Sequence, residues 1–276
     1  MIGTELSTDD LSFSIRTIQS PSTRSTSDGM KVHHIFAFLV KSCFYFGGRV
    51  VVATVPSSSP SLPLKRSVTP QPGSKEEEEK EKDSKEVIAG VACWLPPGKR
   101  INIWNLPVTA KCGVFKILRK AGFGGFNRIV LQYMDQEEKT HAAAFRDRAR
   151  KSSPDSSSSG KKSLKPDDAW YLSMVMTVKE FEGQGCLSLL MREGYAHAAK
   201  TAASGGSVPP FILESSSPRS RDRYIHLGYE IEDHPPTIVG VGKVDSDGLK
   251  ASKETRRKGK APGVEYWCMV NWDPKV

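Results

Sequence analysis

Apolar residues along the chain fall into short periodic stretches that are separated by longer polar ones. Continuous or alternating apolar runs predict strands, which we expect over residues 49–54, 87–95, 168–178, 210–215, 229–231 and 264–272. Apolar positions at helical spacing predict helices over residues 33–46, 111–121, 126–148, 185–201 and 217–227. Because strands and helices alternate in the second half of the chain, the pattern predicts a mixed α/β sheet flanked by helices.

Polar stretches interrupt this pattern and divide the chain. Residues 1–30 predict a flexible N-terminal arm, in which an alternating run at 11–18 is typical of an edge strand. Residues 31–276 are expected to form a single domain with low-complexity insertions, which contain too few apolar residues to pack. These insertions lie at about residues 57–86, 151–166 and 242–262. The first one separates two predicted strands, which we therefore expect to pair as a hairpin.

The composition of the chain narrows the classes of function. Of 276 residues 38% are hydrophobic, and the mean hydropathy is −0.40, as expected for a domain with unpacked insertions. Lys and Arg outnumber Asp and Glu by 40 to 31, and the net charge of +9 suits anionic partners. The five cysteines and six histidines show no metal-ligand spacing, so we expect no metal. Scattered cysteines favour a reducing compartment, which implies a cytoplasmic or nuclear location.

The most apolar stretch, residues 35–55, is not predicted to cross a membrane. Lys41, Arg49 and a Gly-Gly pair at 47–48 interrupt it, whereas a spanning helix needs about 20 mostly uncharged apolar residues. A helix, a turn and a strand account for the stretch better. The N-terminus also lacks the basic and apolar regions of a secretory signal.

The stretch with the clearest chemical content is residues 178–191, where a strand is followed by a turn with two glycines and then by a helix. Glycines allow a close approach to a ligand, and the free N–H groups at a helix start bind anions. The stretch lacks the patterns GxxxxGK[ST] and GxGxxG, which excludes a Walker A loop and disfavours a dinucleotide fingerprint.

Four stretches in this order resemble the GNAT superfamily of N-acetyltransferases. Residues 182–187 (EGQGCL) resemble its motif A, and residues 220–230 (SRDRYIHLGYE) resemble motif B. Residues 211–216 (FILESS) and 266–272 (YWCMVNW) are similar to its fifth and last strands. The resemblance covers about residues 87–275, is weaker over 10–56, and includes similarity to uncharacterised fungal members. It implies a GNAT-like, mostly antiparallel central sheet.

The resemblance also implies where a cofactor binds. Acetyl-CoA would lie between strands 169–178 and 210–215, with its pantetheine arm bonded to the main chain near Met176 and Val178. A main-chain N–H around Val178 would polarise the thioester carbonyl. The pyrophosphate would lie on the N–H groups of a loop formed by Gly183, Gln184, Gly185, Cys186, Leu187 and Ser188.

By the same resemblance, a primary amine of a small molecule or a protein attacks the thioester directly. Tyr224 matches the motif B tyrosine and would donate to the sulfur of CoA. Glu214 ends a strand at the cleft and is the candidate general base, although such a carboxylate often pairs instead with a nearby arginine such as Arg219 or Arg221. The acceptor amine is not identified, and no membrane partner is expected.

Two departures from the family pattern leave other functions open. Glu182 stands where Gln or Arg is usual, and Leu187 where Gly or Ala is usual, which favours a GNAT-like protein that binds acetyl-CoA without turnover. A nucleic-acid-binding module is a third hypothesis, based on the net charge and the basic run at 253–260. That run lacks interleaved aromatic residues for stacking on bases, so nucleic acid is the less favoured partner.

Overall fold

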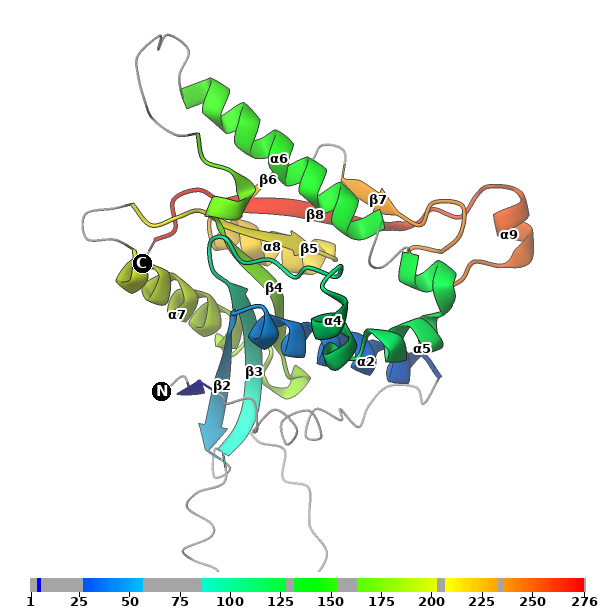
Figure 1. Cartoon of the computed structure of the whole chain (residues 1–276), viewed down its shortest axis with the longest axis horizontal. Coiled ribbons are helices and arrows are strands. Elements are labelled where there is room, and N and C mark those ends of the chain that lie inside the picture. The colour runs from blue at the N-terminus through cyan, green and yellow to red at the C-terminus, as the bar shows by residue number, and fades with distance from the viewer. Residues whose placement is uncertain are drawn as a thin grey trace, which may run out of the picture.

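A computed structural model describes most of the chain and arranges it around one central sheet (Figure 1). Strands lie in the middle, and helices cover both faces of the sheet. The described residues are 4–5, 27–56, 86–127, 132–152, 163–202, 207–232 and 236–275. The predicted edge strand at 11–18 and most of the first two predicted insertions lie outside these ranges.

The sheet has eight strands in the order β1-β2-β3-β4-β5-β8-β6, and β7 also pairs with β8. Every pair is antiparallel except β4 and β5, which run parallel. The predicted fold class, a mixed α/β fold with a mostly antiparallel sheet, is therefore confirmed. The strands are β1 (Thr4–Glu5), β2 (Arg49–Pro56), β3 (Glu86–Leu95), β4 (Trp170–Thr177), β5 (Phe211–Ser215), β6 (Glu230–Ile231), β7 (Thr237–Val239) and β8 (Val264–Asn271).

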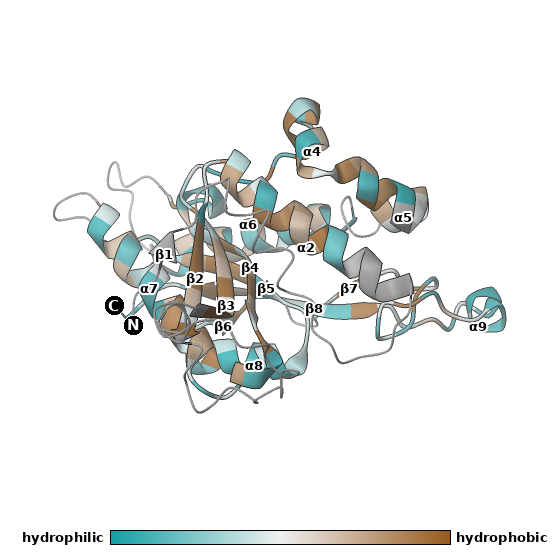
Figure 2. Ribbon diagram, turned by 90° about the horizontal axis from the view of Figure 1, so that it is seen from below, coloured by the Kyte–Doolittle hydropathy of each residue, from teal (hydrophilic) through white to brown (hydrophobic). Residues whose placement is uncertain are grey.

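Helices pack on opposite faces of this sheet. Figure 2 shows α2 and α6 on one side of the strands and α8 on the other. Helix α7 packs on the same side as α8, because both contribute to one buried cluster. The helices are α2 (Ser27–Tyr45), α4 (Leu106–Cys112), α5 (Val114–Phe126), α6 (Tyr133–Ser152), α7 (Cys186–Thr201), α8 (Pro218–His226) and α9 (Lys253–Arg257), with short 3-10 turns η2 (Pro166–Asp168) and η3 (Lys179–Phe181). No helix among the described residues is both long enough and apolar enough to cross a membrane.

The face beneath α7 and α8 is a closely packed aromatic core. The Phe211 ring meets Trp94 edge-on at 5.5 Å and Tyr195 at 4.7 Å. Helix α7 approaches the sheet closely because Gly194 has no side chain: a Cβ there would lie 2.6 Å from the Trp94 ring. Packing of this density stabilises the fold and leaves little room for a ligand on this face.

The face beneath α2 and α6 is packed less uniformly. One cluster lies under α2, where Cys43 packs against Val50 and Cys93. A second lies under α6, where Phe145 packs near Tyr171 and Ile212. Between these clusters the strands carry polar side chains that border a cavity.

Most predicted elements are observed, with informative differences. The hairpin of β2 and β3 is confirmed by its antiparallel register. The helix predicted at 111–121 is two helices, because Gly113 has a left-handed φ of 98° that ends α4 before α5 begins. In the segment 242–262, which we expected to be a loop, Val244 pairs with Lys250 and α9 forms. Val244, Ala251 and Ala261 are buried, so part of this segment packs.

Candidate functional site

The parallel strands β4 and β5 are joined over only a short length. Residue pairs Trp170–Phe211 and Tyr171–Ile212 are in register, and no pair follows them although both strands continue. Beyond Tyr171 the edge of β4 that faces β5 is therefore not hydrogen-bonded to β5 within the described residues. The separation predicted between these strands is present, and it leaves main-chain groups of β4 available to a ligand.

The glycine-containing loop follows directly after β4. Gly183 has φ of 79° and Gly185 of 85°, values that side chains disfavour, and Gly185 forms the N-cap of α7. A Cβ added at either glycine would meet nothing within 4 Å among the described residues. The glycines are therefore required by the turn, and the space outside the loop is open to a ligand.

The loop presents N–H groups to that open space. The first backbone bond of α7 runs from the Leu189 N–H to the Gly185 carbonyl at 2.9 Å, so the amides at Cys186, Leu187 and Ser188 precede the helical ladder. The Gln184 amide is partly engaged, because it donates to the Phe181 carbonyl at 3.3 Å. These residues have the arrangement expected of an anion site at a helix N-terminus.

Two predicted main-chain contacts on β4 are not available as expected. The Val178 N–H donates to the Ala89 carbonyl at 2.8 Å, so it cannot polarise a thioester in the gap. Successive residues in a strand direct their backbone groups to opposite edges, which directs Met176 toward β3 as well. The same alternation directs the backbone groups of Val175 and Thr177 toward the gap. The main-chain groups that face the gap therefore lie one residue away from the predicted Met176 and Val178.

The two departures in motif A are accommodated by their surroundings. Glu182 forms an ion pair with Arg219 at 2.7 Å, which offsets its charge beside the loop. Leu187 packs against the core beneath α7 and α8. Burial raises the pKa of the Cys186 thiol, while the backbone lowers it to a lesser degree, so Cys186 is not an activated thiolate.

Tyr224 of α8 lies in the aromatic core with its side chain 7% exposed, next to the ring of Tyr229 at 5.8 Å. No hydrogen bond within the described ranges engages its hydroxyl. Burial, together with smaller contributions from the charges of Glu214 and Tyr195, raises the pKa of Tyr224 to about 12. The phenol therefore stays protonated at neutral pH and can donate a hydrogen bond.

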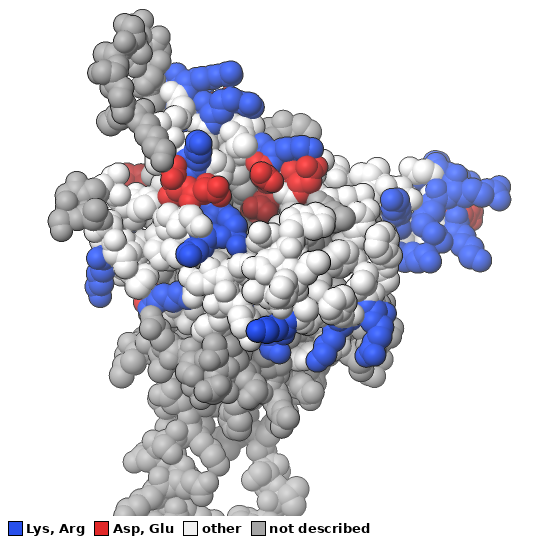
Figure 3. All heavy atoms as spheres, viewed as in Figure 1, with Lys and Arg blue, Asp and Glu red and all other residues white. Residues whose placement is uncertain are grey.

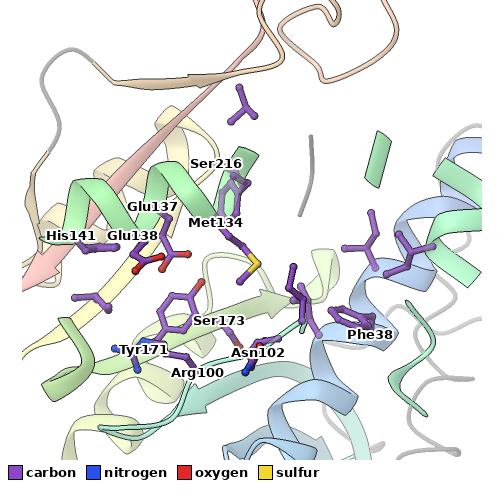
Figure 4. A pocket seen from close by; sticks show the side chains of 18 of the residues that line it. Phe38, Arg100, Asn102, Met134, Glu137, Glu138, His141, Tyr171, Ser173 and Ser216 are labelled. Atoms are coloured by element: carbon purple, nitrogen blue, oxygen red, sulfur yellow. The ribbon is translucent and has the colours of Figure 1, made fainter. Parts of the chain in front are cut away.

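A cavity of about 850 Å³ lies on the opposite face of the sheet, beneath α2 and α6. It reaches the site where β4 and β5 separate, because Tyr171 and Ser173 of β4 and Ser216 after β5 line it. Figure 4 shows Glu137 and Glu138 of α6 on one side of the cavity and Phe38 of α2 on the other. The cavity thus extends from an acidic end to an apolar end.

Glu214 lies in this part of the structure, but its partners differ from those expected. One oxygen accepts bonds from the hydroxyls of Tyr133 at 3.0 Å and Tyr171 at 2.8 Å. The other lies 2.8 Å from Nε2 of His141. The expected pairing with an arginine was wrong: Arg219 pairs with Glu182, and Arg221 pairs with its neighbour Asp222.

The residues of α6 that complete this site were not predicted from the sequence. Tyr133, Glu137 and His141 recur every four residues and so lie on one face of the helix, which is the signal that was missed. Burial raises the pKa of Glu137 well above its usual value, and the charge of Glu214 raises it further, while Arg100 lowers it to a lesser degree.

The same neighbourhood contains three potential metal-ligand atoms, one each from His141, Glu214 and Cys268, within 4.8 Å of one another. Sequence spacing did not predict this group, because pairing of β5 with β8 places Cys268 beside Glu214. The 2.8 Å separation of Nε2 and the carboxylate is a hydrogen bond; two ligands of a tetrahedral zinc at about 2.0–2.1 Å would lie farther apart. In this geometry the group is a hydrogen-bonded cluster.

The basic run forms a separate feature at the end of the molecule. Figure 3 shows Lys and Arg side chains gathered where Figure 1 places α9. Lys258 pairs with Glu254 at 2.6 Å, and Arg256 donates to the Ala251 carbonyl. Some of these basic side chains are therefore engaged by partners within the segment itself.

Neither a protein-family model nor a curated protein matches the chain. One solved structure that it resembles is described as "Crystal structure of histone acetyltransferase HPA2 and related acetyltransferase from Corynebacterium glutamicum ATCC 13032". The match covers 100% of this chain and 98% of that one, with 14% sequence identity and a TM-score of 0.40. An overlap this low carries no functional argument.

Proposed function

We propose that this protein is an acetyl-CoA-dependent N-acetyltransferase that acts on a primary amine. One observation carries the proposal: β4 and β5 separate between the glycine loop at the start of α7 and a cavity beneath α6 that has acidic and apolar ends. Acetyl-CoA bound at the loop would place its thioester in the gap. An acceptor amine bound in the cavity would reach the thioester from the other side. The likeness to GNAT motifs supports the same assignment.

In this proposal the cofactor is held mainly by the main chain. The pyrophosphate accepts hydrogen bonds from the amides between Gly183 and Ser188, where the helix dipole adds a positive potential. The pantetheine arm bonds to the edge of β4 at Val175 and Thr177 in place of Met176 and Val178. Because these donors are backbone groups, neither Glu182 nor Leu187 removes them.

The reaction forms a C–N bond, breaks the C–S bond, and moves one proton overall from nitrogen to sulfur. Tyr224 donates a hydrogen bond to the departing sulfur. Its pKa of about 12 exceeds the value of about 8.5 for a thiol, so it stabilises the thiolate without giving up its proton, and the departing thiolate takes its proton from water. The same burial that raises this pKa keeps the phenol in its donor form.

Glu214 acts in this scheme by positioning His141 and not as the base itself. Three donors already occupy its two oxygens, and its side chain is 4% exposed. In the neutral imidazole, donation from Nε2 to the carboxylate leaves Nδ1 as a proton acceptor. An oriented histidine of this kind can take the proton of the amine.

The proposal is tested by titrating the full chain with acetyl-CoA in a calorimeter. We expect binding in the micromolar range, lost in Gly185→Trp because the bulky side chain fills the open space outside the loop. Gly259→Trp is the matched control, since Gly259 also has a positive φ, 65°, and open space around it. Absence of binding by the unmodified protein, or equal loss in both variants, would contradict the proposal.

A further inference from the structure

We propose that the cavity beneath α6 recognises the acceptor as an amphiphilic primary amine, with its ammonium group at Glu137 and His141 and an aromatic or hydrocarbon body against α2 and Trp104. The assignment deepens the proposed function and rests on it for the fate of the amine. Binding of the amine, however, is a property of the cavity alone and can be measured without acetyl-CoA.

Among the described residues, the acidic end of the cavity has no direct partner for its charge, and Arg100 acts on Glu137 only from a distance. Glu137 faces the cavity beside Glu138 (Figure 4), and neither forms a hydrogen bond or ion pair with another described residue. Space-filling Figure 3 shows acidic side chains gathered on the face where α6 crosses the sheet. A half-buried carboxylate near a second carboxylate is unfavourable without a cation, so this end is suited to a positive group.

The nearby Arg100 does not neutralise this end through direct contact. Its guanidinium donates to the carbonyls of Pro166 and Ala169 and lies over the ring of Tyr171 at 5.4 Å. Its one ion pair within the described ranges is a long contact of 3.9 Å with Asp167. Arg100 therefore anchors η2 beside the cavity, and the carboxylate of Glu137 stays available to a ligand.

His141 supplies an independent observation at the same end. The residue is 1% exposed and lines the cavity, and its Nδ1 has no hydrogen-bond partner within the described residues. An unpaired buried acceptor is unfavourable, and a ligand N–H would remove that penalty. An ammonium group has three N–H donors, which matches an acceptor nitrogen together with the adjacent carboxylate.

The apolar end of the cavity determines which non-polar group of the ligand fits. Its walls are aliphatic and aromatic, and Trp104 adds a large ring that is 73% exposed. A cavity of about 850 Å³ is far larger than an ammonium group and falls in the usual size range for sites that enclose small molecules. The apolar lining residues that cluster at this end are Ile35, Phe38, Leu39 and Ile117.

These two ends select against other acceptors. A small hydrophilic amine would leave the apolar walls uncovered, and an anionic ligand would face Glu137 and Glu138. A neutral molecule of the same shape would fill the apolar end but leave His141 Nδ1 and Glu137 without an N–H donor. Discrimination of this kind comes from unpaired polar groups in the site.

The test is a calorimetric titration of the full chain, without acetyl-CoA, using four probes. Phenylethylamine has both features, phenylethanol lacks the charge, phenylpropionate reverses it, and ethylamine lacks the ring. We expect phenylethylamine to bind at least about tenfold more tightly than each of the other three, which corresponds to about 1.4 kcal/mol. Equal binding of phenylethylamine and phenylethanol, or no binding of either, would overturn the proposal.

Variants locate the binding within the cavity. Glu137→Gln should weaken phenylethylamine about tenfold and leave phenylethanol unchanged, whereas Asp147→Asn, an exposed position on the same helix, should change neither. Trp104→Ala should weaken both ligands equally, because it removes a wall and no charge. An equal effect of the two α6 variants would overturn the assignment of the ammonium group.

A titration with Zn²⁺ tests the competing cation. Micromolar zinc binding that is lost in His141→Ala and that excludes phenylethylamine would make the cluster a metal site and overturn the proposal. Binding of phenylethylamine by a protein that fails to bind acetyl-CoA would support the cavity assignment and reject only the acetyltransferase function. The two proposals therefore fail separately.

Discussion

The two faces of the sheet use the same strands for different purposes. Along β5, Phe211 and Leu213 enter the aromatic core beneath α7 and α8, while Ile212 and Glu214 face the side of α6. One face is closed by ring–ring contacts and by helix α7, which lies so close to the sheet that position 194 has room only for glycine. The other holds the buried carboxylate of Glu214 and a cavity that half-buried Glu137 lines.

The difference teaches where stability and function lie in this fold. Close packing on the first face fixes β4, β5 and the start of α7, and so fixes the gap between the strands. The second face carries groups whose desolvation is unfavourable, such as Glu137, and these are informative because they do not help the fold. Substitutions on the first face should therefore cost stability, and those on the second should change ligand binding.

Gly194→Ala should have the largest effect. The added Cβ would lie 2.6 Å from the ring of Trp94, which is 1% exposed and has no room to move. We expect a loss of about 3 kcal/mol in the free energy of unfolding, measured by urea denaturation.

A second substitution distinguishes this clash from a general weakness of α7. Trp94→Phe removes the ring atoms that the new methyl group meets, and the indole nitrogen forms no hydrogen bond with a described residue. The double variant should therefore recover part of the loss. Additive losses in the double variant would show that the close approach does not limit the core.

Tyr224→Phe should have the next largest effect, on turnover. Loss of the hydrogen bond to the sulfur should lower kcat about 100-fold, which equals about 2.7 kcal/mol in activation free energy, with the KM for acetyl-CoA unchanged. Stability should change little because the ring still fills the core. An unchanged kcat would reject the role of Tyr224 and favour a leaving thiolate stabilised elsewhere.

Glu214→Gln should reduce stability by about 2 kcal/mol. The variant keeps the shape but replaces a charged acceptor of three hydrogen bonds with a neutral amide. Turnover should fall as well, and its pH profile should shift, because His141 loses the group that orients it. If only stability falls and the pH profile of the remaining activity is unchanged, Glu214 supports the fold and not the base.

Glu137→Gln should have the smallest effect, and of opposite sign. The raised pKa means that folding favours the protonated carboxyl, so the stability it contributes is present below about pH 4.5 and is lost as pH rises through the folded-state value. The neutral amide avoids that loss. The variant should match the unmodified protein in acid and exceed it by about 1 kcal/mol at neutral pH.

Thermal unfolding across this pH range measures the difference between the two proteins. A variant that is less stable at neutral pH would show that Glu137 supports the fold. A gain that persists in acid would show that the effect does not come from the charge.

The β4–loop–α7 unit could be predicted from the sequence because its signals are local. A strand, two glycines and a helix start are contiguous, so the loop at 183–188 follows from neighbouring residues alone. The amide directions on β4 could not be predicted in the same way. They depend on the register with β3, in which Val178 pairs with Ala89 and is removed from the gap.

The acidic end of the cavity was missed for a related reason. His141 and Glu214 are 73 residues apart and meet only because α6 packs across β5. The same holds for Glu182, whose charge looked unfavourable in sequence but is paired with Arg219 of α8. Chemistry that depends on long-range contacts requires the fold before it can be assigned.

The central claim is that cofactor and acceptor meet where β4 and β5 separate. Its most direct test is incubation of the full chain with acetyl-CoA and phenylethylamine, followed by mass spectrometry of the small molecules. The account predicts N-acetylphenylethylamine and free CoA in equal amounts, formed faster by the unmodified protein than by Tyr224→Phe. Binding of both compounds without any acetylated product would contradict it, and would instead indicate a protein that holds acetyl-CoA without transferring the acetyl group.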